Sequence, residues 1–526
     1  MPIDLQNLPL LNKELISKKL TTRFSATEIL NLQNLPLPST LNNLSEIAQK
    51  IAQAIKEQKR IVVVGDYDVD GVVSCAILQD FFKRIPYKIA IVIPNRFSDG
   101  YGISSALVER IECDMIITAD NGINAIEAAE VCKKKGIELI ITDHHTPQEI
   151  LPDVLICNPK LSPNFPESEI CGACVAWYLC AAIKKEMNLQ VSMLEFLDLL
   201  ALAIVSDVMP LRGINWVLLK KGLEILEQNK RVSLSLLRNH FKKYPLNSRL
   251  LGYYFVPLLN CAGRLGSAEL AYRFLIQDDF KVACEILEEL LELNWQRKAI
   301  QNQVFLEAKE EFMRQENFET LPFVVVYNPN WNEGVIGIVA AKLCEEFERP
   351  SIVLTSNEGG LKGSMRSSSI DCVEVLERNK EFLEKFGGHF KAAGLGLLQE
   401  KFIDFKSALM KMEIYSKQKN QDDVLGILPL QRIDREVFKT LSEFEPYGEG
   451  NAIPKFVTRA KVLSVKLFGG NNSKVILEQE GITKEALRFF ENLQGCEKQE
   501  MELVYSLQWD CFSSDVILKI EDYFLA

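Results

Sequence analysis

The stretch that decides the fold is Ile61-Val62-Val63-Val64-Gly65-Asp66-Tyr67-Asp68-Val69-Asp70-Gly71. Its four β-branched residues in a row predict a strand that is buried on both faces, as in a parallel sheet. The three carboxylates that follow stand at alternate positions, and alternate side chains of an extended segment point to the same side. Gly71 then permits a sharp turn, and the apolar spacing predicts a helix over Val72–Lys83. We therefore expect a strand–helix unit with acids at the carboxyl end of its strand.

Two more β-branched runs end in an acid. Met115–Ala119 leads into Asp120, Leu139–Thr142 leads into Asp143, and Ile123–Lys135 between them has helical spacing. Strands that alternate with helices predict βαβ units, so we expect an α/β domain with a parallel sheet. Ligands of such sheets bind beyond the carboxyl ends of the strands, which is where all these acids are expected to lie.

A fourth apolar run, Leu199–Ser206, leads into Asp207 and suits either a strand or a buried helix. By itself, Asp207 could be a helix cap instead of a ligand. Asp120-Asn121-Gly122 is likewise a common turn sequence. The functional interpretation of these two acids therefore depends on which residues lie next to them in the folded protein.

Asp143-His144-His145 adds imidazoles to the carboxylates. The chain has only four histidines, so two neighbours at a strand end depart from chance. Imidazole and carboxylate both bind manganese or zinc well, and carboxylates that repel one another need a compensating cation. The alternative is one core histidine with an exposed neighbour.

Asp66–Gly71 also matches the opening of an EF-hand calcium loop. That loop requires Glu at its twelfth position, where this chain has Ile77. A solvated acidic turn stays open as a second alternative. Taken together, the acids and histidines predict a pair of divalent cations and metal-assisted hydrolysis of a phosphoester.

The remaining sequence divides into further units. Residues 1–40 read as an N-terminal arm, residues 41–278 as the domain that carries the acids, and residues 279–318 as a connecting helix without proline. Residues 319–418 read as a second, smaller α/β domain, with a polar linker at Lys417–Asp423. Residues 419–526 alternate as strands do and suggest a small barrel.

The second α/β domain offers groups that suit an anion. Lys362–Ser367 supplies cations and hydroxyls, and Gly387–Gly394 reads as a glycine turn that opens a helix of small residues. A helix N-terminus of that kind binds phosphate. Arg264 is a further phosphate candidate, although each segment alone could be a tight turn.

Composition sets limits on the class of protein. Apolar residues make up 47% and charged residues 25%, as in an ordinary soluble protein. We expect a cytoplasmic location, since no signal peptide and no long apolar run is present. The net charge of −11 counts against a broadly basic surface but leaves room for a narrow basic groove. The 13 dispersed cysteines predict reduced thiols, and Cys171-Gly172-Ala173-Cys174 lacks the second pair that a zinc site needs.

The motifs resemble a known superfamily. Asp66–Gly71, Asp120–Gly122, Asp143–His145 and Asp207 resemble, in order, the four metal motifs of the DHH phosphoesterases. Gly387–Gly394 resembles the glycine-histidine motif of the associated second domain. A RecJ-like exonuclease family is indicated by further segments from about residue 30 to the end: Pro94–Phe97, Gly100–Gly102, Cys171–Ala173, Asn260–Arg264, Trp331 with Gly334–Gly337, and Pro446–Asn451.

The resemblance implies a site and an activity. It implies two manganese or magnesium ions, held by Asp68, Asp70, Asp120, His144 and Asp207, with Asp66 and His145 supporting them. It also implies that Arg264, Arg366, Ser367, Gly388 and His389 bind substrate phosphates.

The implied reaction is 5′-to-3′ degradation of single-stranded DNA in repair and recombination, with an OB-like barrel at the C-terminal end. A single-strand-binding protein and a helicase are candidate partners of a monomer that does not bind membranes. Asn332 and Trp216 depart from the family pattern, in which histidine and arginine are common at these places.

Two other functions stay open. One is a DHH hydrolase of short oligonucleotides or cyclic dinucleotides, although such chains are usually shorter and lack a terminal barrel. The other is a catalytically inactive DNA-binding scaffold, which would be marked by the loss of acids that are all present here.

Overall fold

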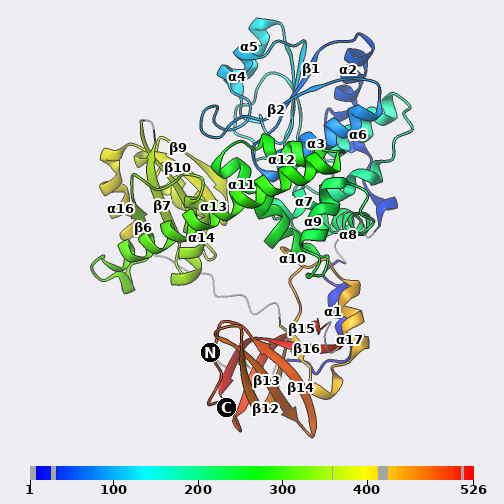
Figure 1. Cartoon of the computed structure of the whole chain (residues 1–526). Coiled ribbons are helices and arrows are strands. Elements are labelled where there is room, and N and C mark those ends of the chain that lie inside the picture. Colours follow the sequence, from blue (N-terminus) through cyan, green and yellow to red (C-terminus); the bar gives the residue numbers. More distant parts are fainter. Residues whose placement is uncertain (1–7, 25–30, 358, 413–423, 511–513, 526) are drawn as a thin grey trace.

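The computed structural model describes residues 8–24, 31–357, 359–412, 424–510 and 514–525. Figure 1 shows three bodies: a first α/β domain, a second α/β domain beside it, and a barrel below both. This architecture confirms the expected fold class, and the predicted linker at Lys417–Asp423 lies outside the described residues.

The first domain is built on a parallel sheet of five strands in the order β2-β1-β3-β4-β5. The predicted strands are β1, β3 and β4, and the sequence analysis missed the two edge strands. The bounds are β1 (Ile61–Val64), β2 (Ala90–Val92), β3 (Met115–Thr118), β4 (Glu138–Thr142) and β5 (Leu155–Cys157).

Helices cover both faces of this sheet because successive strand residues point to opposite sides. Val62 and Val64 of β1 face α4 and α5, whereas Ile61 and Val63 face α2, α3 and α6. The bounds are α2 (Leu44–Lys56), α3 (Val69–Arg84), α4 (Ser105–Arg110), α5 (Ile126–Lys135), α6 (Gly172–Glu186), α7 (Leu197–Ser206), α8 (Gly213–Glu227), α9 (Val232–His240), α10 (Ser248–Leu250), the π-helical segment Leu251–Phe255, α11 (Val256–Leu265) and α12 (Glu269–Ile276).

Two details of the acidic segments differ from expectation. Asp70 does not lie in an extended segment, because α3 begins at Val69. Asp68 is extended and is the N-cap of α3, with Oδ1 accepting from the Gly71 amide at 3.1 Å. A capping aspartate starts a helix where its side chain replaces a missing backbone acceptor. The run before Asp207 is the helix α7, and Asp207 follows it as the C-cap.

The long helix α13 (Phe280–Met313) connects the two α/β domains. Its 34 residues span about 51 Å at 1.5 Å per residue. Its first half packs in the core of the first domain through Ile286 and Leu290, and its second half packs against the second domain through Val304 and Phe312.

The second domain has a mixed sheet in the order β6-β7-β8-β10-β9. Only β6 and β7 are parallel, and the other neighbours are antiparallel. The bounds are β6 (Val324–Tyr327), β7 (Ser351–Asn357), β8 (Gly360–Arg366), β9 (Lys385–His389), β10 (Ala392–Leu397), α14 (Ile336–Phe347), α15 (Cys372–Arg378) and α16 (Phe402–Met410).

The helix predicted within Gly387–Gly394 is wrong. This segment is a hairpin in which His389 pairs with Ala392 across a two-residue turn. Each glycine costs a helix about 1 kcal/mol, and β8 supplies the hydrogen-bond partners that favour a strand over Ala392–Leu397. No helix N-terminus therefore exists here to bind phosphate.

The barrel closes because β12 pairs with both β13 and β15. Its bounds are β11 (Val424–Ile427), β12 (Lys455–Phe468), β13 (Asn472–Gln479), β14 (Ile482–Arg488), β15 (Glu500–Asp510), β16 (Asp515–Leu525) and α17 (Arg435–Glu443). The N-terminal arm belongs to the same core, since Leu11 and, in α1 (Lys13–Thr21), Ile16 and Leu20 are fully buried there.

Trp216 joins the barrel to the first domain. Its ring lies 5.1 Å from the ring of Phe24, and its Nε1–H donates to the Phe444 carbonyl at 3.2 Å. Lys220 covers the same indole at 4.3 Å. The family departure at this position therefore has a structural role at a domain junction.

Among the described residues no helix is long and apolar enough to cross a membrane. The cysteines that the structure describes are all free thiols, and most are buried.

We expect Trp216→Ala to lower the free energy of unfolding by about 3 kcal/mol, because it removes a large buried ring from the junction. Thermal unfolding measures the loss. The matched control is Trp295→Ala on α13, whose side chain is 66% exposed, and which should change stability by no more than about 0.5 kcal/mol. Equal losses in both variants would contradict the role of Trp216 at the junction.

Candidate metal centre

Seven side chains gather beyond the carboxyl end of the first sheet. They form three overlapping groups of possible ligands, in which every donor atom lies within 4.8 Å of the others: Asp66, Asp68 and Asp120; Asp70, His144 and Asp207; and Asp120, His144 and His145. All the acids and histidines that the sequence singled out as metal-site residues are therefore brought together.

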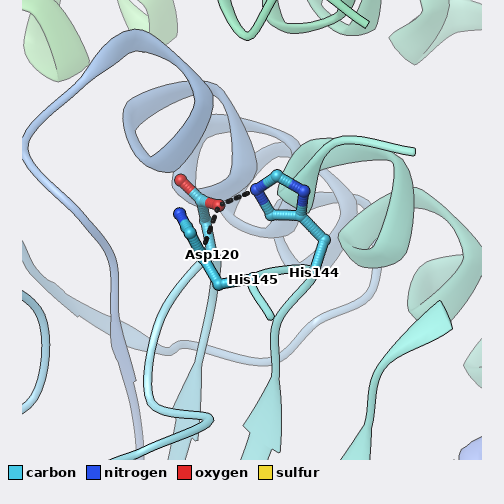
Figure 2. Close-up of side chains that lie close together, drawn as sticks. All are labelled: Asp120, His144 and His145. Atoms are coloured by element: carbon cyan, nitrogen blue, oxygen red, sulfur yellow. Dashed lines mark ion pairs between the residues drawn. The ribbon is translucent and has the colours of Figure 1, made fainter. Parts of the chain in front are cut away.

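His144 lies at the middle of this cluster. Its Nε2 is 3.2 Å from Asp120 Oδ1, 3.5 Å from Asp207 Oδ2 and 3.7 Å from Asp70 Oδ2. Figure 2 shows the Asp120 carboxylate pointing at this imidazole, with His145 on the neighbouring position of the chain. Residues from β3, β4 and α7 thus converge on one point.

Several donor atoms in this cluster have no hydrogen-bond partner among the residues that the structure describes. They are Asp66 Oδ1, Asp120 Oδ1, His144 Nε2 and Asp207 Oδ2. A buried polar atom without a partner is costly, and four of them aimed at one place fit the donor set of a divalent cation. The residues present therefore suit the metal that the motifs predict.

The electrostatics point the same way. Burial raises the pKa of Asp66, Asp120 and Asp207 well above its ordinary value, and the neighbouring carboxylates raise it further. Burial and the charge of Asp68 raise the pKa of Asp70 to about 7. Burial also lowers the pKa of His144, so this imidazole is neutral and free to be a ligand. Only a cation in the middle would stabilise all of these carboxylates in their charged form.

The N-terminus of α6 positions Asp70. The backbone amides of Gly172 and Ala173 donate to its two oxygens at 2.6 and 2.9 Å. A Cβ atom at position 172 would lie 2.4 Å from Asp120 Oδ1, so only glycine fits between these two acids. The segment Cys171–Cys174 therefore serves the cluster through its backbone, and neither of its two cysteines belongs to a ligand group among the described residues.

Asp143 has a different task from the other acids. Its carboxylate accepts from the amides of Ile123, His144 and His145, and it bonds His145 Nδ1 at 2.7 Å. Although burial opposes charge on both groups, their mutual hydrogen bond lowers the pKa of Asp143 and raises the pKa of His145 to about 9. Asp143 thus orients His145, a role that the sequence analysis did not assign.

The second domain reaches the cluster through its β9–β10 hairpin. The ring of His389 lies 6.4 Å from the ring of His145, with an angle of 26° between their planes. Gly388 precedes it in β9 and is exposed. Ser367 is only 4% exposed, and its hydroxyl already accepts from the amides of Ser369 and Ile370.

Arg96 and Arg264 lie within electrostatic reach of the acids, and Arg366 lies within electrostatic reach of Arg264. Arg264 donates to the Gly334 carbonyl at 3.0 Å, across the boundary between the two α/β domains. Burial and, to a smaller extent, the charges of Arg96 and Arg366 lower its pKa to about 10. A Cβ atom on residue 334 would lie 2.0 Å from the Arg264 carbonyl, so glycine is required for this close approach.

Neighbouring guanidinium groups repel one another and therefore suit an anion between them. Arg96 belongs to this group, although the sequence analysis did not name it as a site residue. Its Nε has no partner among the described residues, and its guanidinium lies 4.5 Å from the Tyr67 ring centroid. The only earlier signal was its place in the segment Pro94–Phe97.

Comparison with known proteins gives three matching family models. They are the N-terminal domain of the DHH family over residues 60–204, the DHHA1 domain over residues 320–413 and the RecJ OB domain over residues 426–522.

Similar proteins cover most of the chain. The single-stranded-DNA-specific exonuclease RecJ of Haemophilus influenzae is 30% identical over 525 residues, which cover 93% of this chain and 91% of that protein. Its counterpart from Salmonella typhimurium is 34% identical and covers 84% and 82% of the two chains. The crystal structure of RecJ with Mn²⁺ from Thermus thermophilus superposes with a TM-score of 0.83 at 28% identity, and it covers 97% of this chain and 75% of that one.

We expect Asp120→Asn to stabilise the protein in EDTA at pH 8, because it removes one buried negative charge. A gain of about 1 kcal/mol would raise the unfolding temperature by roughly 3 °C. A raised pKa means that Asp120 itself takes up a proton as the pH falls. The advantage of the variant should therefore shrink as the pH falls through the pKa of the folded protein.

With Mn²⁺ the natural protein should be the more stable of the two, because the variant loses a ligand atom. Thermal shift as a function of Mn²⁺ concentration measures this, and we expect the variant to need at least about 100-fold more Mn²⁺. An unchanged Mn²⁺ dependence would remove Asp120 from the metal site.

Proposed function

The chain belongs to the RecJ family of DHH phosphoesterases, and on that premise we propose that it is a metal-dependent exonuclease that degrades single-stranded DNA from the 5′ end. The observation that carries the proposal is the set of unpartnered donor atoms on Asp66, Asp120, His144 and Asp207. Converging oxygen and imidazole donors beside a group of arginines suit metal-assisted hydrolysis of a phosphodiester.

We propose two divalent cations, Mn²⁺ or Mg²⁺, in this centre. Support comes from Asp120, which belongs to two of the three ligand groups and so suits a carboxylate that bridges two ions. Asp68, Asp70, His144 and Asp207 would complete the ligands. Bound cations would stabilise negative charge on the phosphoryl oxygens and make water a better nucleophile at neutral pH.

The protein's own groups would hold the substrate. Arg96, Arg264 and Arg366 offer charge-assisted hydrogen bonds to a phosphate that lies next to the metal centre. His389 would approach the same phosphate from the second domain, since its ring faces His145. Ser367 and Gly388 would act by shaping the backbone next to Arg366 and His389.

The close contact between Arg264 and Gly334 supports selection for single strands. It holds the two α/β domains together next to the metal centre. A strand that enters there must be narrow enough to pass between two domains, and a duplex is about twice as wide. A barrel with the OB fold suits the part of the strand that lies outside.

The biological setting that we propose is DNA repair and recombination. A monomer of this kind would act on single strands supplied by a helicase and coated by a single-strand-binding protein. Both are proposed as partners.

The test is cleavage of a single strand labelled at either end, in Mn²⁺ and in EDTA. A 5′-to-3′ exonuclease releases the 5′ label at once as a mononucleotide, whereas the 3′ label stays on strands that shorten. A blunt duplex and a linear dinucleotide complete the set. Release of the 3′ label first, equal loss of the duplex, or cleavage of the dinucleotide alone would each contradict the proposal.

We further expect Arg366→Gln to lose discrimination between 5′-phosphoryl and 5′-hydroxyl strands. Removing one charged hydrogen bond to a phosphate costs about 1.5–3 kcal/mol, which is roughly 10- to 100-fold in kcat/KM for the phosphorylated strand. The hydroxyl strand should lose much less. The control is Arg378→Gln on α15, an exposed arginine that pairs only with Glu374 of its own helix among the described residues. A uniform loss on both strands would contradict recognition of a terminal phosphate.

A further inference from the structure

A long stretch of the first domain contains no acidic residue. Between Glu227 and Glu269 the sequence has no Asp or Glu, although the chain as a whole holds 71 of them and has a net charge of −11. The same stretch has seven basic residues: Lys230, Arg231, Arg238, Lys242, Lys243, Arg249 and Arg264. Such a local excess in an acidic protein favours a negatively charged partner.

Two of these cations already have roles elsewhere. Arg231 pairs with Asp80 and Asp198 inside the first domain, and Arg264 belongs to the arginine group beside the metal centre. Lys242, Lys243 and Arg249 are exposed. They have no acid within their own stretch to neutralise them.

Aromatic rings lie among the exposed cations. The rings of Tyr244 and Tyr254 stack at 4.3 Å with an angle of 30° between them. Tyr254 contacts Phe241 at 5.2 Å, and Phe241 rests on the fully buried Phe255 at 5.8 Å. The stack is therefore anchored at its base.

Cations lie around this stack, and the neighbouring Tyr253 is exposed. The Lys243 ammonium lies 4.9 Å from the centroid of the Tyr244 ring, and Arg249 and Lys298 lie within electrostatic reach of the two stacked tyrosines. Tyr253 is 73% exposed. We call the exposed residues Lys242, Lys243, Arg249 and Tyr253, together with the half-buried Tyr244 and Tyr254, the Tyr244 patch.

The patch is close to the metal centre on one side. Tyr253 and Tyr254 lie in the π-helical segment Leu251–Phe255, and π-helical turns are frequent at functional sites. Gly252 of this segment packs against Val205, two residues before Asp207, with 3.3 Å from an ideal Cβ at position 252 to the Val205 side chain. The segment continues directly into α11, which carries Arg264.

On its other side the patch is close to the barrel. The Ser248 hydroxyl of α10 donates to the Tyr447 carbonyl at 2.6 Å, in the segment that leads into the barrel. Figure 1 shows α10 at the edge of the first domain that faces the barrel. The helical segments that carry the patch thus contact α7, which ends at Asp207, on one side and the chain that leads into the barrel on the other.

We propose that the Tyr244 patch binds the single-stranded part of the substrate that extends from the metal centre towards the barrel. This inference rests on the proposed function and names a contact surface for it outside the metal and phosphate groups. Unpaired bases would stack on the tyrosine rings, and Lys242, Lys243 and Arg249 would contact the phosphates between them. Bases of a duplex are already stacked and would not bind in this way.

The test uses the full chain and the double variant Lys242→Glu/Lys243→Glu. Binding is measured by fluorescence anisotropy with phosphorothioate strands that resist cleavage. We expect at least about tenfold weaker binding of a strand of about 25 nucleotides, and no more than about twofold weaker binding of one of about 4 nucleotides, which occupies the metal centre alone. Tyr244→Ala should weaken binding of the long strand about fivefold.

The matched control is Lys133→Glu/Lys134→Glu on α5, which makes the same change of charge on the helix layer that covers the opposite face of the sheet. The control should bind both strands like the natural protein, and the unfolding temperature of both double lysine variants should stay the same. The salt dependence of long-strand binding should become less steep in the lysine variant only.

Equal weakening for long and short strands, or equal weakening in the α5 control, would overturn the proposal. Undiminished binding of the long strand by both patch variants would overturn it as well. Since binding is measured without cleavage, these results are distinct from a failure of the natural protein to cut either strand, which would count against the proposed function instead.

Discussion

The repulsion among buried carboxylates at the end of the first sheet is the constraint on which the rest of the structure depends. Asp66, Asp70 and Asp120 are withdrawn from water, and burying an unpaired charge costs several kcal/mol. Hydrogen bonds from the surroundings reduce that cost. Two backbone amides of α6 donate to Asp70, and a backbone amide in the first turn of α3 donates to Asp68. The atoms left without partners mark the place where we propose that a cation binds.

A second self-repelling group stands next to the first. Arg96, Arg264 and Arg366 raise one another's energy as like charges, just as the acids do. Bound cations would reduce the repulsion among the acids, and a phosphate would reduce the repulsion among the arginines. A substrate phosphate that contacts both the cations and the arginines would therefore be stabilised by both. The two α/β domains must stay in register for this, which explains the length of α13 and the tight contact at Gly334.

Local sequence was enough to predict the centre but not its wider surroundings. The runs before Asp66, Asp120 and Asp143 predicted three strands of the sheet, because burial on both faces leaves a strong apolar signal. The hairpin at Gly387–Gly394 was missed because its glycines and alanines lack the β-branched, alternating pattern that marks a strand, although its two strands pair locally. The run before Asp207 suited a strand or a helix equally, since it is apolar throughout. The place of Arg96 near Arg264 could not be obtained from spacing, because these residues are distant in sequence.

The packing of the N-terminal arm in the barrel has a consequence for how the chain is made. Leu11, Ile16 and Leu20 leave the ribosome first, yet the core that covers them is completed by strands as late as β16. These side chains stay uncovered during nearly the whole of synthesis, when exposed apolar surface favours aggregation. Removing about the first twenty residues from a recombinant protein would therefore leave an apolar cavity in the C-terminal barrel, although the barrel is encoded some four hundred codons downstream.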